Sequence, residues 1–299
     1  MNGARKRALA AIAAGALALV PAAAGADVQA NTHVDTLNAA VGGGAIAVSG
    51  TATFVSIPTQ VGLDGTGDAA VAGLGADVTS LKISRPSAGS ANMKFEMGIA
   101  DQPVAPVSGG PMIVWNWPLL TDDTDNGYYL EARRVSASPF FPNANANPQF
   151  MLVHNHADGF HEHGPITGTM ADGVVSWTVS LSAIQASTAS TIGTSSGCAA
   201  LGSTASVPGG FILCANAGGD GAFLDVESYE IPKARVQLGL APAGTPESAV
   251  TMSETATVNA TTGAYSVAIA KPAPGSYILV AKACFGSDNC GLSSTTITV

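Results

Sequence analysis

The chain has 299 residues and a formal net charge of −9, and only 11% of its residues are charged. An acidic surface repels phosphate backbones and anionic lipid headgroups, which argues against nucleic acid and membrane surfaces as partners. The composition is dominated by Gly, Ala, Ser, Thr and Val. Such a composition is typical of an extracellular β-protein rather than a helical one.

Residues 1–26 have the features of a secretory signal peptide. Arg5, Lys6 and Arg7 form a basic start, residues 8–20 form a short apolar stretch, and Ala24-Gly25-Ala26 is a typical cleavage site. Cleavage after Ala26 would remove three basic residues and take the net charge from −9 to −12. Because no other apolar run reaches the roughly 20 residues that cross a bilayer, we expect a secreted, extracellular protein without a membrane span.

Short runs of β-branched and aromatic residues, separated by Gly, Pro, Asn and Asp clusters, predict many strands and almost no helix. Only 181–187 has a briefly helical pattern. The strands are expected at 45–57, 77–85, 93–100, 111–117, 128–136, 150–157, 160–163, 174–181, 211–215, 222–227, 234–240, 249–258, 264–269, 276–285 and 293–299.

The spacing of these strands predicts an all-β fold with two antiparallel β-sandwich domains after the cleaved signal peptide. We expect a flexible segment at 27–43, a β-sandwich at 44–230 and a small immunoglobulin-like sandwich at 231–299. The boundary is predicted at SYEIPK, residues 228–233.

Four cysteines in a secreted chain indicate two disulfides, for which three pairings are available. Cys198 and Cys214 flank a loop rich in Gly, Ser, Thr and Pro, and Cys284 and Cys290 flank the turn FGSDN. The simplest prediction is therefore Cys198–Cys214 and Cys284–Cys290.

The most specific stretch is QFMLVHNHADGFHEHGPITGT, residues 149–169, which holds four of the five histidines. Asp158-Gly159 is a turn signal between two strand-like runs, so the stretch predicts a β-hairpin. In that register His156 faces His161, Asn155 faces Glu162, and His154 faces His163. All four imidazoles then lie on one face, because cross-strand partners share a face and side chains alternate.

Facing Cβ atoms in a hairpin lie roughly 5 Å apart, so two to four imidazoles could bind one ion. His154, His156, His161 and His163 thus form a candidate metal site. Neutral imidazole suits zinc, copper or nickel, whereas calcium and magnesium prefer oxygen ligands. An exposed turn with solvated histidines is the alternative.

Two other groups of residues are candidate sites. The acidic turn TDDTDNG could bind calcium weakly through Asp122, Asp123 and Asp125, although a surface turn without calcium explains it as well. Trp115 and Trp117 share one face of their strand and could form a flat platform for a sugar ring. Packing in the core is the usual fate of such tryptophans.

Two stretches resemble known families. The tail GSYILVAKACFGSDNCGLSSTTITV, residues 275–299, resembles the last strands of secreted bacterial immunoglobulin-like or fibronectin-III-like modules, which implies a spacer or adhesion module. The stretch LDGTGDAAVAGLGADVTSLKIS, residues 63–84, resembles the start of DOMON and family-9 carbohydrate-binding domains, which implies a β-sandwich that binds sugar or haem.

These patterns predict a secreted, non-catalytic binding or surface-associated protein with a transition-metal site on the histidine hairpin. No pair of carboxylates, and no Ser, Cys or Lys with a nearby base, forms a recognisable catalytic set. A carbohydrate-binding protein and a metal-dependent enzyme are the alternatives. An extracellular glycan or a protein is the expected partner, and the sequence does not predict the oligomeric state.

Overall fold

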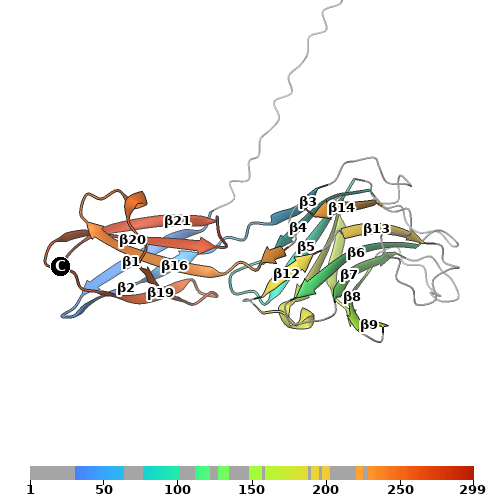
Figure 1. Ribbon diagram of the computed structural model, residues 1–299, viewed down its shortest axis with the longest axis horizontal. Coiled ribbons are helices and arrows are strands. Elements are labelled where there is room, and N and C mark those ends of the chain that lie inside the picture. Colours follow the sequence, from blue (N-terminus) through green and yellow to red (C-terminus); the bar gives the residue numbers. More distant parts are fainter. Residues whose placement is uncertain are drawn as a thin grey trace, which may run out of the picture. The chain divides into compact units, whose positions relative to one another are not determined.

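The computed structural model describes residues 31–63, 77–100, 112–121, 127–134, 148–156, 159–187, 190–194, 197–202, 220–224 and 228–299. Within these ranges the protein is all-β, as predicted, and its strands pair antiparallel in three sheets (Figure 1). The helical elements described are two short 3-10 helices, η1 (Leu181–Ile184) and η3 (Glu247–Ala249). No helix in this part of the chain is long and apolar enough to cross a membrane. The predicted signal peptide lies outside the described residues.

The middle of the chain forms the large sheet, in the order β10-β11-β5-β4-β3-β14-β13-β6-β7-β8-β9, with β12 bridging β6 and β15. Its strands are β3 (Thr59–Leu63), β4 (Val78–Ser84), β5 (Asn92–Ile99), β6 (Met112–Thr121), β7 (Tyr128–Arg134), β8 (Gln149–His156), β9 (Gly159–Pro165), β10 (Thr167–Ala171), β11 (Val174–Ser180), β12 (Thr191–Thr194), β13 (Gly197–Gly202), β14 (Asp220–Leu224) and β15 (Ser228–Glu230).

Alternation along β5 illustrates how the sequence builds the core of the large sheet. Met93, Phe95 and Met97 are buried, while the polar residues between them point to the other face. The ring of Phe95 meets that of Trp117 on β6 edge to face, with ring centroids 5.5 Å apart. Because four strands separate β5 from β6 in the sheet order, this contact means that the sheet folds back and encloses one core.

Both ends of the described chain form a second unit, the two-sheet unit. One sheet has the order β1-β2-β19-β18 and the other β17-β16-β20-β21. The bounds are β1 (His33–Val41), β2 (Ala45–Thr53), β16 (Ala234–Pro242), β17 (Glu254–Thr255), β18 (Thr257–Val258), β19 (Ala264–Ala270), β20 (Ser276–Phe285) and β21 (Cys290–Thr298). Residues from both sheets, such as Val48 and Leu279, share one hydrophobic cluster.

The two-sheet unit divides the chain differently from the sequence prediction. Residues 33–41, expected to be flexible, form β1, and β2 pairs with β19 rather than with strands of residues 54–230 (Figure 1). The predicted domain of residues 44–230 therefore loses its first strand to the C-terminal unit. The physical reason is that Ile46 and Val48 of β2 complete the core formed by β16 and β20.

Tyr265 connects the outer strand β1 to β19 across β2. Its hydroxyl donates a 2.7 Å hydrogen bond to the backbone oxygen of Thr36, passing over Gly50 of β2. A Cβ atom at Gly50 would collide with that oxygen and with the Tyr265 ring, so this position requires glycine. Burial, with a smaller contribution from the Asp35 carboxylate, raises the pKa of Tyr265 to about 12.

The predicted disulfide between Cys284 and Cys290 is confirmed. The two residues are direct partners in the pairing of β20 with β21, and their Cα atoms lie 4.2 Å apart. Cys214 lies outside the described residues, so the pairing Cys198–Cys214 stays a prediction.

We expect Tyr265→Phe to lower the free energy of unfolding by about 1–2 kcal/mol, because it deletes a partly buried hydrogen bond between two strands. Urea unfolding of the variant and the wild type measures this difference. Ser266→Ala, at the neighbouring exposed position of β19, is the control and should change stability by less than about 0.5 kcal/mol. Equal stabilities of the Tyr265 variant and the wild type would contradict the role of the hydroxyl.

Stability should also fall at alkaline pH. Burial raises the pKa of Tyr229, like that of Tyr265, to about 12. Unfolded phenols ionise near pH 10, so between about pH 10 and pH 12 the folded state holds more protons and its stability decreases as pH rises. Below about pH 10 this contribution is fully present. Urea midpoints measured across this range should fall less steeply for Tyr265→Phe than for the wild type; identical slopes would contradict the assignment to Tyr265.

Candidate functional site: the histidine hairpin

The histidine-rich stretch forms the predicted hairpin of β8 and β9, but with a different register. His154 pairs with His161, Asn155 with Phe160, and His156 with Gly159. The predicted pairings of His156 with His161, Asn155 with Glu162 and His154 with His163 are therefore wrong. One strand is displaced by two positions against the other relative to the prediction, and an even displacement leaves the paired histidine positions on one face.

A bulge interrupts the hairpin at His163. Val153 pairs with Glu162 and Leu152 pairs with Gly164, so His163 is the extra residue of β9. Such a bulge locally bends the strand and re-aims its side chain. Gly164 follows with a φ of 109°, a conformation that glycine adopts readily.

His154 lies on the core face of β8. Leu152, two positions earlier, belongs to the core of the large sheet, and the His154 side chain is itself buried, with 3% of the residue exposed. Its imidazole stacks on the ring of Tyr128, its cross-strand partner on β7, with ring centroids 4.2 Å apart and planes 10° from parallel. Burial raises the pKa of Tyr128. The stack therefore holds one imidazole rigidly at the edge of the core.

His163 is exposed, and its ring meets the stack from the side. Its ring centroid lies 5.2 Å from that of His154 and 6.1 Å from that of Tyr128. His161, the strand partner of His154, is also exposed. For His156 the structure describes the backbone but not the side chain. The hairpin thus brings the buried imidazole of His154 and the exposed imidazole of His163 together. His161 lies on the position of β9 that pairs with His154.

The separation of the His154 and His163 rings is compatible with a shared metal ion. At a metal–nitrogen distance of about 2.0–2.1 Å, the ion lies roughly 3.2 Å from each ring centroid. Two such rings at a tetrahedral angle have centroids roughly 5.2 Å apart, which equals the observed distance. Among the residues that the structure describes, no group of three or more His, Cys, Asp or Glu side chains is arranged to hold a metal ion.

The two tryptophans predicted as a sugar platform are part of the core. Trp115 and Trp117 have no exposed surface, and Trp117 packs against Phe95. They point inward because their partners on β7, Ala132 and Leu130, are themselves core residues. Rings enclosed in this way do not present a flat surface to a sugar. The candidate calcium residues Asp122, Asp123 and Asp125 lie outside the described residues.

Sequence reasoning missed a polar cluster on the opposite face of β6 and β7. Glu131 is buried, its Oε2 accepts a 2.5 Å hydrogen bond from Arg133 Nε, and its Oε1 accepts a 3.2 Å bond from Asn116 Nδ2. Burial and the nearby Glu131 carboxylate raise the pKa of Tyr129. In the sequence, these polar residues alternate with core residues, which predicts that they lie on the other face of the sheet. Alternation alone suggests that this face is exposed, and it does not predict that the polar residues are buried.

Comparison with known proteins finds no matching family model, and no curated protein or solved structure is significantly similar to the chain.

We expect Glu131→Ala to lower the free energy of unfolding by about 3 kcal/mol, because it removes a buried carboxylate that accepts bonds from the partly buried Arg133 guanidinium and the buried Asn116 amide. Chemical denaturation measures the change. Glu96→Ala is a matched control, since Glu96 pairs with Lys94 at the same spacing on β5, but the Lys94 side chain is 41% exposed. The control should cost less than about 1 kcal/mol. Similar losses in both variants would contradict the importance of burial.

Proposed function

We propose that the protein is a secreted, non-catalytic binding protein whose histidine hairpin binds a transition-metal ion. The observation that carries the proposal is the 5.2 Å separation of the His154 and His163 rings, a distance suited to two imidazole ligands of one ion. His161 is the cross-strand partner of His154, but among the described side chains these three histidines do not form a three-ligand group. Water would fill the remaining positions.

The donor chemistry restricts the metal. Imidazole nitrogen suits zinc, copper(II) and nickel, whereas calcium and magnesium require several oxygen ligands. His154 stacks on Tyr128 with both ring nitrogens buried, and His163 is exposed, so an ion would approach from the His163 side and reach His154 only if the side chains around that ring moved. A preorganised ligand of this kind lowers the ordering cost of metal binding.

The arrangement of the two-sheet unit supports the proposed relationship to immunoglobulin-like modules. In the lettering used for immunoglobulin folds, the strands receive the letters A, B, C, C′, D, E, F and G in the order β1, β2, β16, β17, β18, β19, β20 and β21. One sheet then reads A-B-E-D and the other C′-C-F-G, the two orders found in such sandwiches. The Tyr277 hydroxyl donates a 2.9 Å hydrogen bond to the oxygen of Ala273, near the start of strand F. A tyrosine bonded in this way at that corner is a hallmark of the fold.

In this assignment the large sheet is an insertion between strands B and C. Its residues lie between β2 and β16 in the chain, and the strands of the two-sheet unit pair without them. The proposed protein is thus an immunoglobulin-like carrier with an inserted β-domain that presents the histidine hairpin. This architecture suits a surface-associated binding role.

Metal titration of the purified protein tests the proposed site. Calorimetry with Zn(II), Cu(II) and Ni(II) should show saturable binding that weakens by at least roughly tenfold in His163→Ala. His154→Phe should bind equally weakly while the aromatic stack, and with it the fold, is kept. Lowering the pH to about 5 should also weaken binding, because protons compete for imidazole nitrogen.

His33→Ala is the matched control, since His33 is the fifth histidine and lies on β1. It should bind each metal as the wild type does. Binding that survives both His154→Phe and His163→Ala, or that is lost in His33→Ala, would refute the hairpin as the metal site.

A further inference from the structure

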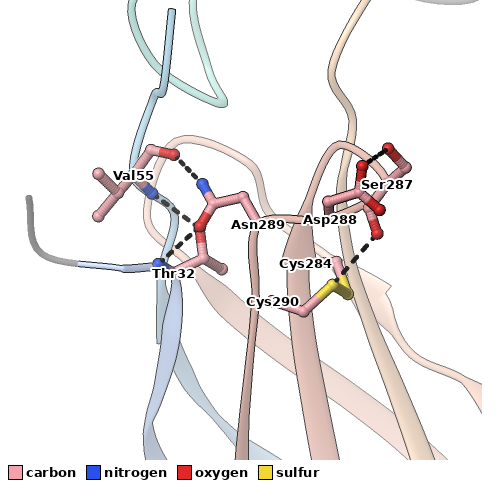
Figure 2. Close-up of a disulfide and its surroundings, with 7 residues drawn as sticks. All are labelled: Thr32, Val55, Cys284, Ser287, Asp288, Asn289 and Cys290. Atoms are coloured by element: carbon pink, nitrogen blue, oxygen red, sulfur yellow. Dashed lines mark hydrogen bonds between the residues drawn. A yellow bond between two sulfur atoms is a disulfide. The ribbon is translucent and has the colours of Figure 1, made fainter. Parts of the chain in front are cut away.

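The disulfide of the two-sheet unit closes the turn Phe285 to Asn289 between β20 and β21 (Figure 2). Within the turn the amide of Phe285 donates to the oxygen of Asn289 at 3.0 Å, and Gly286 has a φ of 86°. The turn is thus short, and its covalent closure limits the directions in which the Asn289 side chain can point.

Asn289 uses both ends of its side-chain amide to hold two other parts of the chain. Its Oδ1 accepts a 3.2 Å hydrogen bond from the amide of Thr32, just before β1. Its Nδ2 donates a 2.5 Å bond to the oxygen of Val55, just after β2. Figure 2 shows this amide between the two segments. One side chain therefore joins the turn to two segments that lie 257 and 234 positions away in the sequence.

Thr32 completes the connection. Its Oγ1 accepts a 3.0 Å hydrogen bond from the amide of Val55, and the residue has no exposed surface. The backbone oxygen of Thr32 lies so close to Gly291 that a Cβ atom there would collide with it. The chain at the start of β1 therefore lies in close contact with the start of β21, next to the disulfide.

The N-terminal end of β1 lies at the edge of its sheet. Among the described strands, β1 is outermost and pairs with β2, and this pairing is irregular between Val34 and Thr36. Edge strands of this kind open locally more easily than central strands. The bonds from Asn289 thus join this edge to the turn after β20, in addition to the bonds that Thr36 and Asp35 make with β2.

We propose that the disulfide-closed turn is a thiol-sensitive clasp on the N-terminal strand. While the Cys284–Cys290 bond is intact, Asn289 is held in position to bond Thr32 and Val55. A dithiol breaks the S–S bond by exchange: it delivers two electrons and two protons, leaves two cysteine thiols, and becomes a cyclic disulfide. The turn then gains conformational freedom, Asn289 leaves its partners, and the start of β1 detaches from β21.

The clasp is independent of the proposed metal site, which lies on other strands. Its effect is local, because the core of the two-sheet unit rests on the pairing of β2 with β19 and of β16 with β20. In an oxidising environment the clasp stays closed, and exposure to small thiols opens it.

Amide hydrogen exchange measured by NMR tests the clasp. With the disulfide intact, the amides of Thr32 and Val55 should be protected; after treatment with dithiothreitol, their exchange should accelerate by at least roughly tenfold. The amides of Val48 and Leu279, in the core strands, should change by less than about twofold. Asn289→Ala, which keeps the disulfide, should accelerate exchange at Thr32 as reduction does.

Ser287→Ala is the matched control, because Ser287 lies in the same turn and its hydroxyl bonds the neighbouring Asp288, whereas its backbone oxygen, which lies near the Cys290 sulfur in Figure 2, is kept in the variant. It should leave the exchange of Thr32 and Val55 unchanged. Unchanged exchange at Thr32 in Asn289→Ala, or after reduction, overturns the proposal. A uniform rise at all four amides on reduction also overturns it, since the disulfide would then support the whole unit rather than the start of β1.

Discussion

The pairing of β2 with β19 is the constraint on which the rest of the architecture depends. It joins residues that are more than 200 positions apart and gives the C-terminal strands their second sheet. Without β1 and β2, the apolar faces of β16 and β20, with Val236 and Leu279, would have no covering layer from the N-terminal segment. The entropic cost of closing so long a loop is modest, because it grows only with the logarithm of length and the intervening chain folds on its own core.

The alternation of apolar and polar residues was sufficient to predict those strands whose neighbours in the sheet alternate in the same way. β5, β7, β11 and β20 were expected within two residues of their observed bounds, as was the disulfide that closes the turn after β20. β1 was not predicted because, of its nine residues, only Val34 is buried. It is a strand because β2 provides backbone partners, and such long-range pairing leaves little trace in composition.

The candidate site shows the same division between local and distant information. Alternation alone indicated that the hairpin histidines share a face, and that Trp115 and Trp117 share one. Which face meets the core depends on neighbouring strands, and this decides that the tryptophans and His154 point inward. The register of the hairpin differed because the pairing begins at His156 with Gly159, and the bulge at His163 had no signal in the sequence. The buried position of Glu131 likewise depends on what covers its strand.

The stack of His154 on Tyr128 gives the proposed metal site its physical character. An imidazole held between a core aromatic ring and the sheet cannot reorient freely, so it offers a fixed ligand rather than a mobile one. His163 sits on a bulge, where the strand departs from the regular ladder and can adjust to an incoming ion. With one ligand already fixed, only the other side chain must be ordered when an ion binds, which lowers the cost of binding. The buried ligand also ties metal binding to the integrity of the large sheet, since loosening β7 or β8 would separate the ring from its partner.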